Sequence, residues 1–253
     1  MARKGKSQHL KRLAAPASWP IHRKEFKWTV KPKPGPHSPH TSLPLLLVVR
    51  DVLGLVKNRR EAQMMLAQGH VKVDGRAISE GGYPVGLMDV IEVPIIDQAF
   101  RMIPSKKGLN LHVIKEDEKT FKLCKIVNKT TVHHGNLQLN AHDGRNFLIK
   151  TIDPKNTVED VYNTHDVLKI EIPNQAILDH LPLEAGVLGV VERGKRAGTR
   201  VEVKQIVKSK QPTVPSSVVL QDFKGNQFET ILDYVFPIGK KVSWISLPEE
   251  TND

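Results

Sequence analysis

Cysteine is almost absent from this chain of 253 residues, which holds only Cys124. A single cysteine cannot form an internal disulfide, so the sequence is typical of a cytosolic protein and excludes a disulfide scaffold. Long apolar runs are absent as well, because the longest, residues 45–49, is far too short to cross a bilayer. The basic start lacks the apolar stretch of a secretory signal peptide. We therefore predict a cytoplasmic protein without a membrane segment.

Patterns for catalysis and metal binding are also lacking. His133-His134 and Cys124 do not have the spacing of a zinc site, and His142-Asp143 is typical of a hairpin turn. Residues 189–195 match the first seven positions of a phosphate-binding P-loop, but Arg196 follows where a magnesium-binding Ser or Thr is required. We predict no enzyme, no metal, no cofactor and no small-molecule substrate.

Acidic residues are scarce in residues 1–42, where Glu25 is the single carboxylate. Ten cations give this segment a charge of +9 out of +11 for the whole chain. Six prolines forbid a long helix. Such a segment is predicted to stay extended or disordered until it binds a polyanion. The cations are Arg3, Lys4, Lys6, Lys11, Arg12, Arg23, Lys24, Lys27, Lys31 and Lys33.

Aromatic residues are interleaved with these charges, Trp19 and Trp28 above all. A solvated basic tail is the simplest interpretation, but large aromatic rings favour RNA, whose exposed bases they can stack on. We expect both tryptophans to pack on bases or on the body of the protein, with His9 also in the RNA-binding set. A tail lying on a membrane surface would need an amphipathic helix, which the prolines break.

Residues 43–93 are predicted to form the first compact unit. Leu45, Val48, Val49, Val52, Leu53 and Val56 follow helical spacing and predict a first helix that ends near Gly54 or Lys57. Asn58 and Glu61 form the pattern of a capping box, so a second helix should begin there. Gly69 suits the left-handed residue after that helix, and Asp74-Gly75 predicts a hairpin. A returning strand should follow within residues 85–93.

Arg59 and Arg60 are unusual in this unit, because cations in a first helical turn face the positive end of the helix dipole. They are either two solvated arginines or a phosphate site shared with the free N–H groups of the helix start. The unit resembles the small αL RNA-binding module named after ribosomal protein S-four. That resemblance implies that Arg59, Arg60, His70 and Lys72 face RNA.

The rest of the chain is predicted to be all-β. Residues 94–173 hold alternating strands at 121–127, 137–141, 147–149 and 168–172, which indicate a small barrel or sandwich. In residues 174–253, a strand at 187–191, a glycine-containing loop and a strand at 200–207 resemble a KOW motif. Val201 stands where that motif has a third glycine. The loop glycines and nearby cations suit a phosphate backbone, although an ordinary hairpin has the same strand pattern. The cations are Arg193, Lys195, Arg196 and Arg200.

Short matches in one order along the chain resemble the S-four-e small-subunit ribosomal proteins of archaea and eukaryotes, and the short acidic end is more typical of archaea. These matches include His9–Pro16 with Trp19, Gly35–His37, Tyr83-Pro84, Met88–Ile91, Lys122–Lys125, Ile238–Lys240 and Trp244–Pro248. The resemblance implies an α+β, predominantly β protein of the small ribosomal subunit that binds rRNA and contacts neighbouring ribosomal proteins. An RNA-modifying enzyme with an αL targeting module and a free RNA chaperone are the alternatives.

Overall fold

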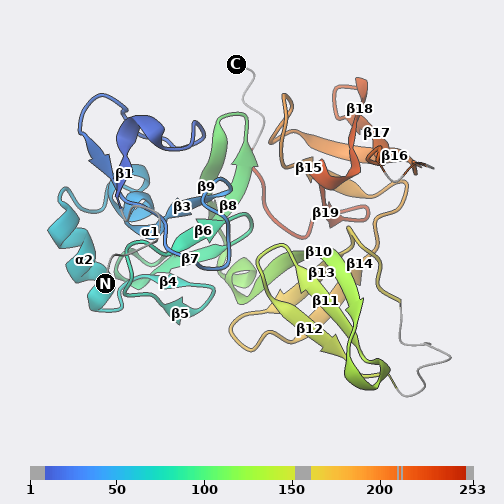
Figure 1. Ribbon diagram of the computed structural model, residues 1–253, viewed down its shortest axis with the longest axis horizontal. Coiled ribbons are helices and arrows are strands. Elements are labelled where there is room, and N and C mark those ends of the chain that lie inside the picture. Colours follow the sequence, from blue (N-terminus) through green and yellow to red (C-terminus); the bar gives the residue numbers. More distant parts are fainter. Residues whose placement is uncertain (1–8, 152–160, 210, 212, 249–253) are drawn as a thin grey trace, which may run out of the picture. The chain divides into compact units, whose positions relative to one another are not determined.

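The computed structural model describes residues 9–151, 161–209, 211 and 213–248. The chain divides into two compact units, Met1–Met102 with Lys107–Val113 and Ile103–Lys106 with Ile114–Asp253. Short helices and many strands make up both units, which confirms the predicted α+β, predominantly β class (Figure 1). Among the described residues, no helix has the length and hydropathy needed to cross a membrane.

The two predicted helices of the first unit are present. Helix α1, Leu45–Leu47, continues directly into the π-helical turn η2, Val48–Val52, and the chain leaves this helix at Gly54 with φ of 63°. Helix α2, Arg59–Ala67, begins where Glu61 accepts a 3.2 Å hydrogen bond from the backbone N–H of Asn58. Gly69 takes the left-handed conformation with φ of 75°, as predicted.

A five-stranded sheet lies beside these helices, in the order β5-β4-β7-β8-β9. Asp74 and Gly75 both have positive φ and join β4 to β5 in the predicted hairpin. Strand β8 pairs with β7, so this sheet continues past residue 94, where the sequence predicted a boundary. The strands are β4 (Lys72–Val73), β5 (Arg76–Ala77), β7 (Val90–Val93), β8 (Gln98–Ser105) and β9 (Gly108–Ile114), with the short turn η3 (Pro94–Ile96) before β8.

The basic N-terminal segment differs most from expectation. From residue 9 onward it packs on the first unit instead of standing free: Trp19 is only 4% exposed and belongs to the same core as Leu45 and Leu66. The indole N–H of Trp19 donates a 2.9 Å hydrogen bond to the carbonyl of Ser42. Burial of apolar side chains of the segment in the core of the module stabilises the packed state by more than repulsion among the segment's cations destabilises it. Its elements are β1 (Leu10–Lys11), η1 (Arg12–Ala14), β2 (Trp28–Thr29), and β3 (Ser42–Pro44), which pairs with β6 (Pro84–Gly86).

The central sheet of the second unit has the order β12-β11-β10-β13-β14. Alternate residues of its strands, such as Cys124, Leu139 and Ile170, form one apolar cluster, as the alternating sequence predicts. Strand β14 pairs with β13, so this sheet continues past residue 174, where the sequence predicted a second boundary. The elements are η4 (Glu116–Thr120), β10 (Phe121–Thr131), η5 (His133–Gly135), β11 (Leu137–Ala141), β12 (Asn146–Ile149), β13 (Val167–Glu171) and β14 (Ile177–Leu181).

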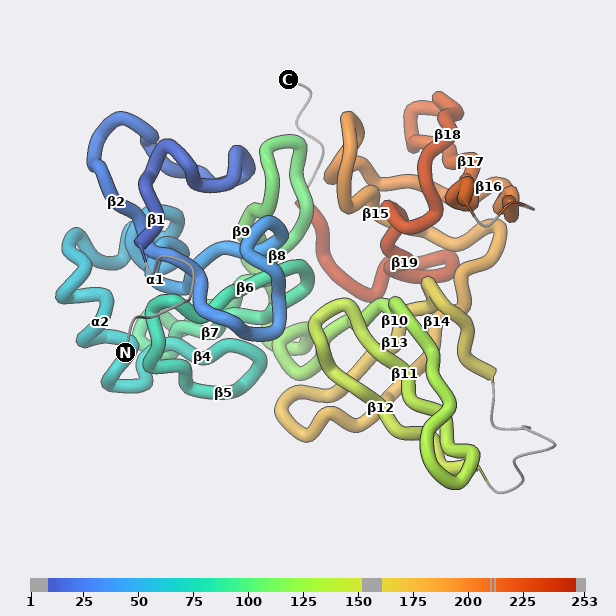
Figure 2. The backbone as a smooth tube through the Cα atoms, viewed as in Figure 1, coloured from blue at the N-terminus to red at the C-terminus, as the bar shows by residue number. Residues whose placement is uncertain are grey.

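The last sheet has five strands in the order β18-β17-β16-β15-β19 (Figure 2). The predicted strand–loop–strand is β15 and β16, which pair antiparallel. Val201, which replaces the third glycine of the KOW pattern, lies in β16 with its side chain fully buried, so this position is part of the core and not of a turn. The elements are β15 (Leu188–Val191), β16 (Arg200–Val207), β17 (Ser217–Asp222), β18 (Gln227–Ile231), η6 (Leu232–Tyr234) and β19 (Val235–Gly239).

Candidate nucleic-acid interface

The start of α2 presents two exposed cations, Arg59 and Arg60, and neither has an ion-pair partner among the residues the structure describes. The Glu61 carboxylate accepts the backbone N–H groups of Asn58 and Lys57 at 3.2 and 3.1 Å. The hydrogen bond from Asn58 is the main cause that lowers the pKa of Glu61, so this carboxylate stays ionised. These bonds are part of a capping box at the start of α2, in which the backbone N–H of Glu61 also bonds to the Asn58 side chain, and the exposed arginine side chains stand beside it.

His70 and Lys72 follow α2 and are half-buried. The backbone N–H of His70 donates to the carbonyl of Met65 at 3.2 Å, within the turn that closes the helix. Lys72 lies on β4 directly opposite Glu92 of β7. These two residues are thus less accessible to a large anion than Arg59 and Arg60.

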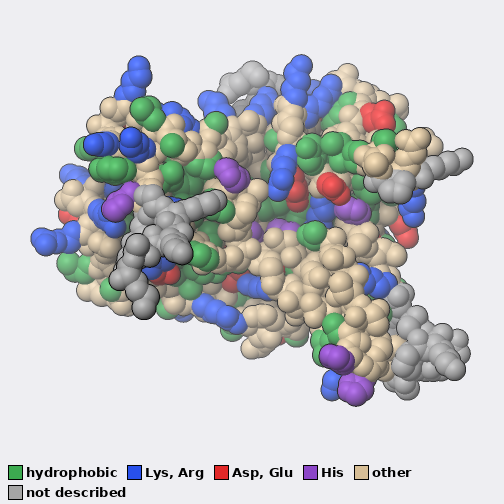
Figure 3. All heavy atoms as spheres, viewed as in Figure 1, with side chains coloured by type: hydrophobic (Ala, Val, Ile, Leu, Met, Phe, Trp, Pro, Cys, Tyr) green, Lys and Arg blue, Asp and Glu red, His purple; other side chains and the backbone are tan. Residues whose placement is uncertain are grey.

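The N-terminal segment divides its cations between surface and interior. Lys11, Lys24, Lys27 and Lys33 are exposed, and Lys31 is half-buried. Trp28 keeps 50% of its surface exposed, with the ammonium of Lys27 at 5.3 Å from its ring. Figure 3 shows Lys and Arg side chains protruding around α2, with fewer carboxylates among them. Arg3, Lys4 and Lys6 lie outside the described residues.

Three predicted RNA-binding residues of this segment are used inside the protein. Arg12 is 4% exposed, and its guanidinium lies 3.6 Å from the carboxylate of Glu25. Arg23 donates to the carbonyls of Ala15 and Pro16 at 3.0 and 2.8 Å. Trp19 therefore packs on the body of the protein, one of the two expected outcomes, and the buried Arg12 has little surface left for RNA, whereas Arg23 is half-buried.

The loop of residues 192–199 between β15 and β16, called the KOW loop below, exposes Arg193, Lys195 and Arg196. Gly198 has φ of 84°, and a Cβ there would lie 2.8 Å from the Cα of Ser105, so only glycine fits. The guanidinium of Arg196 lies 4.1 Å from the centre of the Phe228 ring, which holds it over β18. A loop fixed in this way presents its cations without a large ordering cost.

Arg200 does not join this group. Its guanidinium donates at 2.5 Å to the carbonyls of Leu247 and Pro248, and its side chain is half-buried. It therefore fastens the C-terminal segment to β16. The prediction that it contacts RNA is not supported by these contacts.

A groove of about 1110 Å³ in the first unit holds residues that the sequence did not single out. Gln63 of α2, Ser79, Gly81 and Gly82 line it together with residues of the N-terminal segment. The only signal in the sequence was the Gly81-Gly82 pair, which predicted a loop. The groove exists because the N-terminal segment folds back on the module, and no local sequence pattern predicts that contact.

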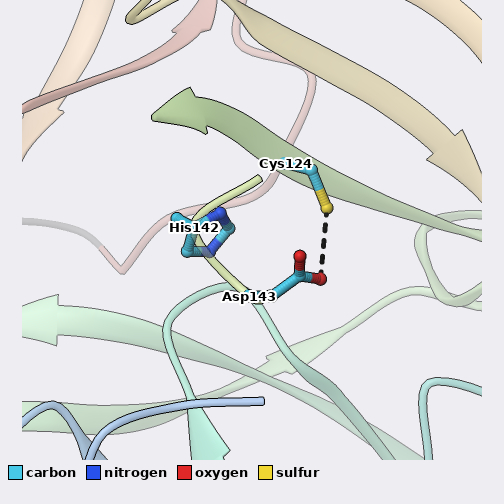
Figure 4. A group of neighbouring side chains, drawn as sticks. All are labelled: Cys124, His142 and Asp143. Atoms are coloured by element: carbon cyan, nitrogen blue, oxygen red, sulfur yellow. Dashed lines mark hydrogen bonds between the residues drawn. The ribbon is translucent and has the colours of Figure 1, made fainter. Parts of the chain in front are cut away.

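Cys124, His142 and Asp143 are brought together in the second unit, with donor atoms within 4.8 Å of one another (Figure 4). The Cys124 thiol lies 3.4 Å from Asp143, whose Oδ2 also lies 3.0 Å from the ammonium of Lys122. Arg145 adds its Nε at 3.2 Å. Burial raises the pKa of Asp143, but these cations outweigh it and hold that pKa well below its usual value. A carboxylate already engaged by two cations is poorly suited to a metal ion.

Lys125 forms a second buried ionic contact in this unit. Its ammonium donates to the carbonyl of Asp233 at 2.6 Å and lies 3.8 Å from the carboxylate of Glu192. Burial lowers the pKa of Lys125 and raises the pKa of Glu192. Lys122 and Lys125 are therefore structural cations between strands and do not contribute to an RNA-binding surface.

Three family models match successive parts of the chain. They are the RS4NT domain over residues 4–40, the S4 domain over residues 44–91 and Ribosomal family S4e over residues 96–177. The matched S4 domain coincides with the helices, hairpin and returning strand described above.

Relatives match over nearly the whole length. The small ribosomal subunit protein eS4 of Staphylothermus marinus is 50% identical over 250 residues, covering 98% of this chain and 99% of the relative. The eS4 protein of Methanothermobacter thermautotrophicus is 45% identical over 249 residues, with 98% and 99% covered. The crystal structure of ribosomal protein S4e from Thermoplasma acidophilum has a TM-score of 0.66 and 30% identity, and covers 80% of this chain and 98% of that one. The chain belongs to the S4e family of ribosomal proteins.

Proposed function

We propose that this chain is a structural constituent of the small ribosomal subunit that binds and stabilises small-subunit rRNA. Its relatives carry the name small ribosomal subunit protein eS4. The observation that carries the proposal is the exposure of Arg59 and Arg60 at the start of α2, with no carboxylate partner among the described residues. Unpaired arginines facing the positive end of a helix are unfavourable in the free protein and are compensated by a phosphate.

Two further basic surfaces support this function. The exposed lysines of the N-terminal segment, Lys11, Lys24 and Lys27, lie in the same unit as Arg59. The KOW loop supplies Arg193, Lys195 and Arg196. Together these residues would neutralise about eight phosphates and release the counterions bound to them. The protein acts by positioning and neutralising RNA in the cytoplasmic ribosome, next to neighbouring small-subunit proteins, and it supports translation without a reaction of its own.

Salt dependence of RNA binding tests this proposal. The affinity of the full chain for small-subunit rRNA is measured from low to high salt, and neutralising about eight phosphates predicts a slope of log affinity against log salt of roughly −6 to −7. A slope shallower than about −3 would contradict the proposed contacts. The exposed triple variant K11Q/K24Q/K27Q should flatten the slope by about 3 if these lysines contact phosphates.

Sedimentation separates the proposal from its two alternatives. A structural constituent stays with small subunits through a high-salt wash at about one copy per subunit. An RNA chaperone that acts outside the ribosome is stripped by the same wash, and an RNA-modifying enzyme leaves a modified nucleoside in the rRNA. Either of these two results would contradict the proposed structural function and support the corresponding alternative.

A further inference from the structure

The groove of the first unit is bounded by the N-terminal segment and by the S4 module. Two walls come from the strands β1 and β2 and from the first turns of α2, and Val30, Pro32 and Leu46 supply apolar surface between them. Pro32 and Leu46 are buried, so this surface is backed by the core of the unit. At about 1110 Å³ the groove exceeds the roughly 300–1,000 Å³ of a small-molecule site, and its size suits a segment of a longer chain.

The groove is held in shape by close backbone contacts. The backbone N–H of Lys33 donates to the carbonyl of Gly82 at 2.8 Å, and that of Leu46 donates to Gly81 at 3.0 Å. A Cβ at Gly81 would lie 2.9 Å from Leu46, and a Cβ at Gly82 would lie 3.1 Å from Lys33. The two glycines allow this close approach, so the groove is formed before any ligand arrives.

An aromatic ring stands at one wall. Trp28 lines the groove and is 50% exposed, which is unusual for a residue that normally buries its large ring. The ring of His9 lies 5.6 Å away at an angle of 53°, so the two rings are not stacked on each other. An exposed indole beside an apolar floor is a stacking surface for a planar group.

The charges of the groove select the class of ligand. Lys31, Lys33 and Arg59 line it against one carboxylate, that of Glu80, which forms an ion pair with Lys33. Arg59, on the wall formed by α2, has no ion-pair partner among the residues in the described ranges. A ligand that complements both features has a flat ring and a negative charge. A nucleotide has both, whereas an acidic peptide lacks the ring at each charged position.

We propose that this groove binds an unstacked nucleotide of a single-stranded RNA segment, with its base against Trp28 and a phosphate at Arg59. The inference rests on the proposed function and assigns to it a single-stranded element, in addition to the phosphates of folded rRNA. Stacking on an aromatic face does not depend on the base sequence. The site therefore distinguishes unpaired from paired nucleotides and does not distinguish one base from another.

The test compares two strands of equal charge. Fluorescence anisotropy measures binding of the full chain to a labelled oligoadenylate of about ten nucleotides and to an abasic ribose-phosphate strand of the same length. The phosphates are matched, so a difference reports contacts to bases. We expect oligoadenylate to bind about 5- to 150-fold more tightly, the range that one stacked base provides. Equal affinities for the two strands would overturn the proposal.

Variants then assign the preference to Trp28. Trp28→Leu keeps an apolar side chain in β2 but removes the aromatic face, and should abolish most of the preference without changing the affinity for the abasic strand. Trp28→Phe should restore much of the preference. Phe223→Ala, which removes a 68% exposed ring in the second unit, is the matched control and should change neither affinity. If Trp28→Leu keeps the full preference, the bases bind elsewhere and the groove proposal is wrong.

Failure of this site can be distinguished from failure of the proposed function. A chain that binds small-subunit rRNA with a steep salt slope, yet shows no preference for bases at Trp28, retains its function and loses only this site. A chain that does not bind rRNA at all contradicts the proposed function itself.

Discussion

The Nε2 atom of His37 lies 3.0 Å from Oδ1 of Asp89, and both side chains are buried. His37 belongs to the N-terminal segment and Asp89 to the turn before β7, so this contact fastens the segment to the S4 module. The other carboxylate oxygen of Asp89 accepts the backbone N–H of Gly86 at 2.8 Å. The segment is therefore part of the folded unit, and its cations are presented on a fixed surface.

Gly86→Ala is expected to destabilise the first unit strongly. A Cβ at this position would lie 2.2 Å from Cγ of His37, so the imidazole would have to leave its contact with Asp89. Overpacking of this kind costs about 1–3 kcal/mol, and the lost buried contact adds to it. Chemical denaturation followed by circular dichroism measures the change. Gly225→Asn is the control, because nothing lies within 4 Å of that position and Asn tolerates its left-handed backbone.

Replacement by phenylalanine is expected to lower stability at Trp19 and to have little effect at Trp28. Trp19→Phe leaves the buried carbonyl of Ser42 without the indole donor, so the free energy of unfolding should fall by about 1–3 kcal/mol. Trp28→Phe at a half-exposed site should change it by less than about 0.5 kcal/mol. Equal losses in the two variants would show that Trp19 is not a member of the core.

Deletion of residues 1–42 is expected to unfold the first unit and not merely to weaken RNA binding. The deletion removes Ala15 and Trp19 from the apolar core and His37 from Asp89. Limited proteolysis of the truncated chain should cleave within residues 43–102, which the full chain protects. If the truncated unit resists proteolysis and loses only RNA affinity, the segment is an independent tail.

Asp143→Asn is expected to cost about 3–5 kcal/mol near neutral pH, because it leaves the buried ammonium of Lys122 without its carboxylate at 3.0 Å. The pKa of Asp143 is lowered in the folded state, so its contribution to stability is present above the unfolded pKa of about 3.9 and is lost as the pH falls toward the folded pKa. The difference in unfolding free energy between the chain and the variant should therefore shrink in acid.

The control for that pH dependence is Asp97→Asn. Asp97 is exposed and has φ of 50°, a conformation that Asn tolerates, so the substitution should change stability little at any pH. A constant difference between the chain and Asp143→Asn from neutral pH to below about pH 3 would show that the charge of Asp143 does not stabilise the fold.

Arg193→Gln with Lys195→Gln is expected to flatten the salt dependence of rRNA binding by about 2 in slope, with no change in thermal stability. Both side chains are exposed in the KOW loop, whereas Arg196 also packs on Phe228 and would confound the result. Arg200→Gln is the contrast. This variant should lower stability, because the hydrogen bonds to the carbonyls of Leu247 and Pro248 are lost. It should leave the salt slope of rRNA binding unchanged.

Local patterns predicted the elements well where neighbours in sequence decide the structure. The capping box of Asn58 and Glu61, the left-handed Gly69 and the Asp74-Gly75 hairpin all appear as expected, because each depends on hydrogen bonds within a few residues. The alternating strands of the second unit were also recognisable from Leu137, Leu139 and Ala141. The full extent of each sheet was not, since the pairing of β8 with β7 and of β14 with β13 continues the sheets past the expected limits.

The amino-acid sequence by itself determined the charge of this protein, the type of its local elements and its family. Only the tertiary structure decided which cations face solvent. Arg12, Arg23 and Arg200 look the same as Arg59 and Arg60 in sequence. The first three bond to groups brought near by folding, and the last two have no such partner within the part of the chain that the structure describes. The physical reason is that the exposure of a charged side chain depends on partners distant along the chain. Those partners come within reach only once the core, with Trp19 in it, has formed.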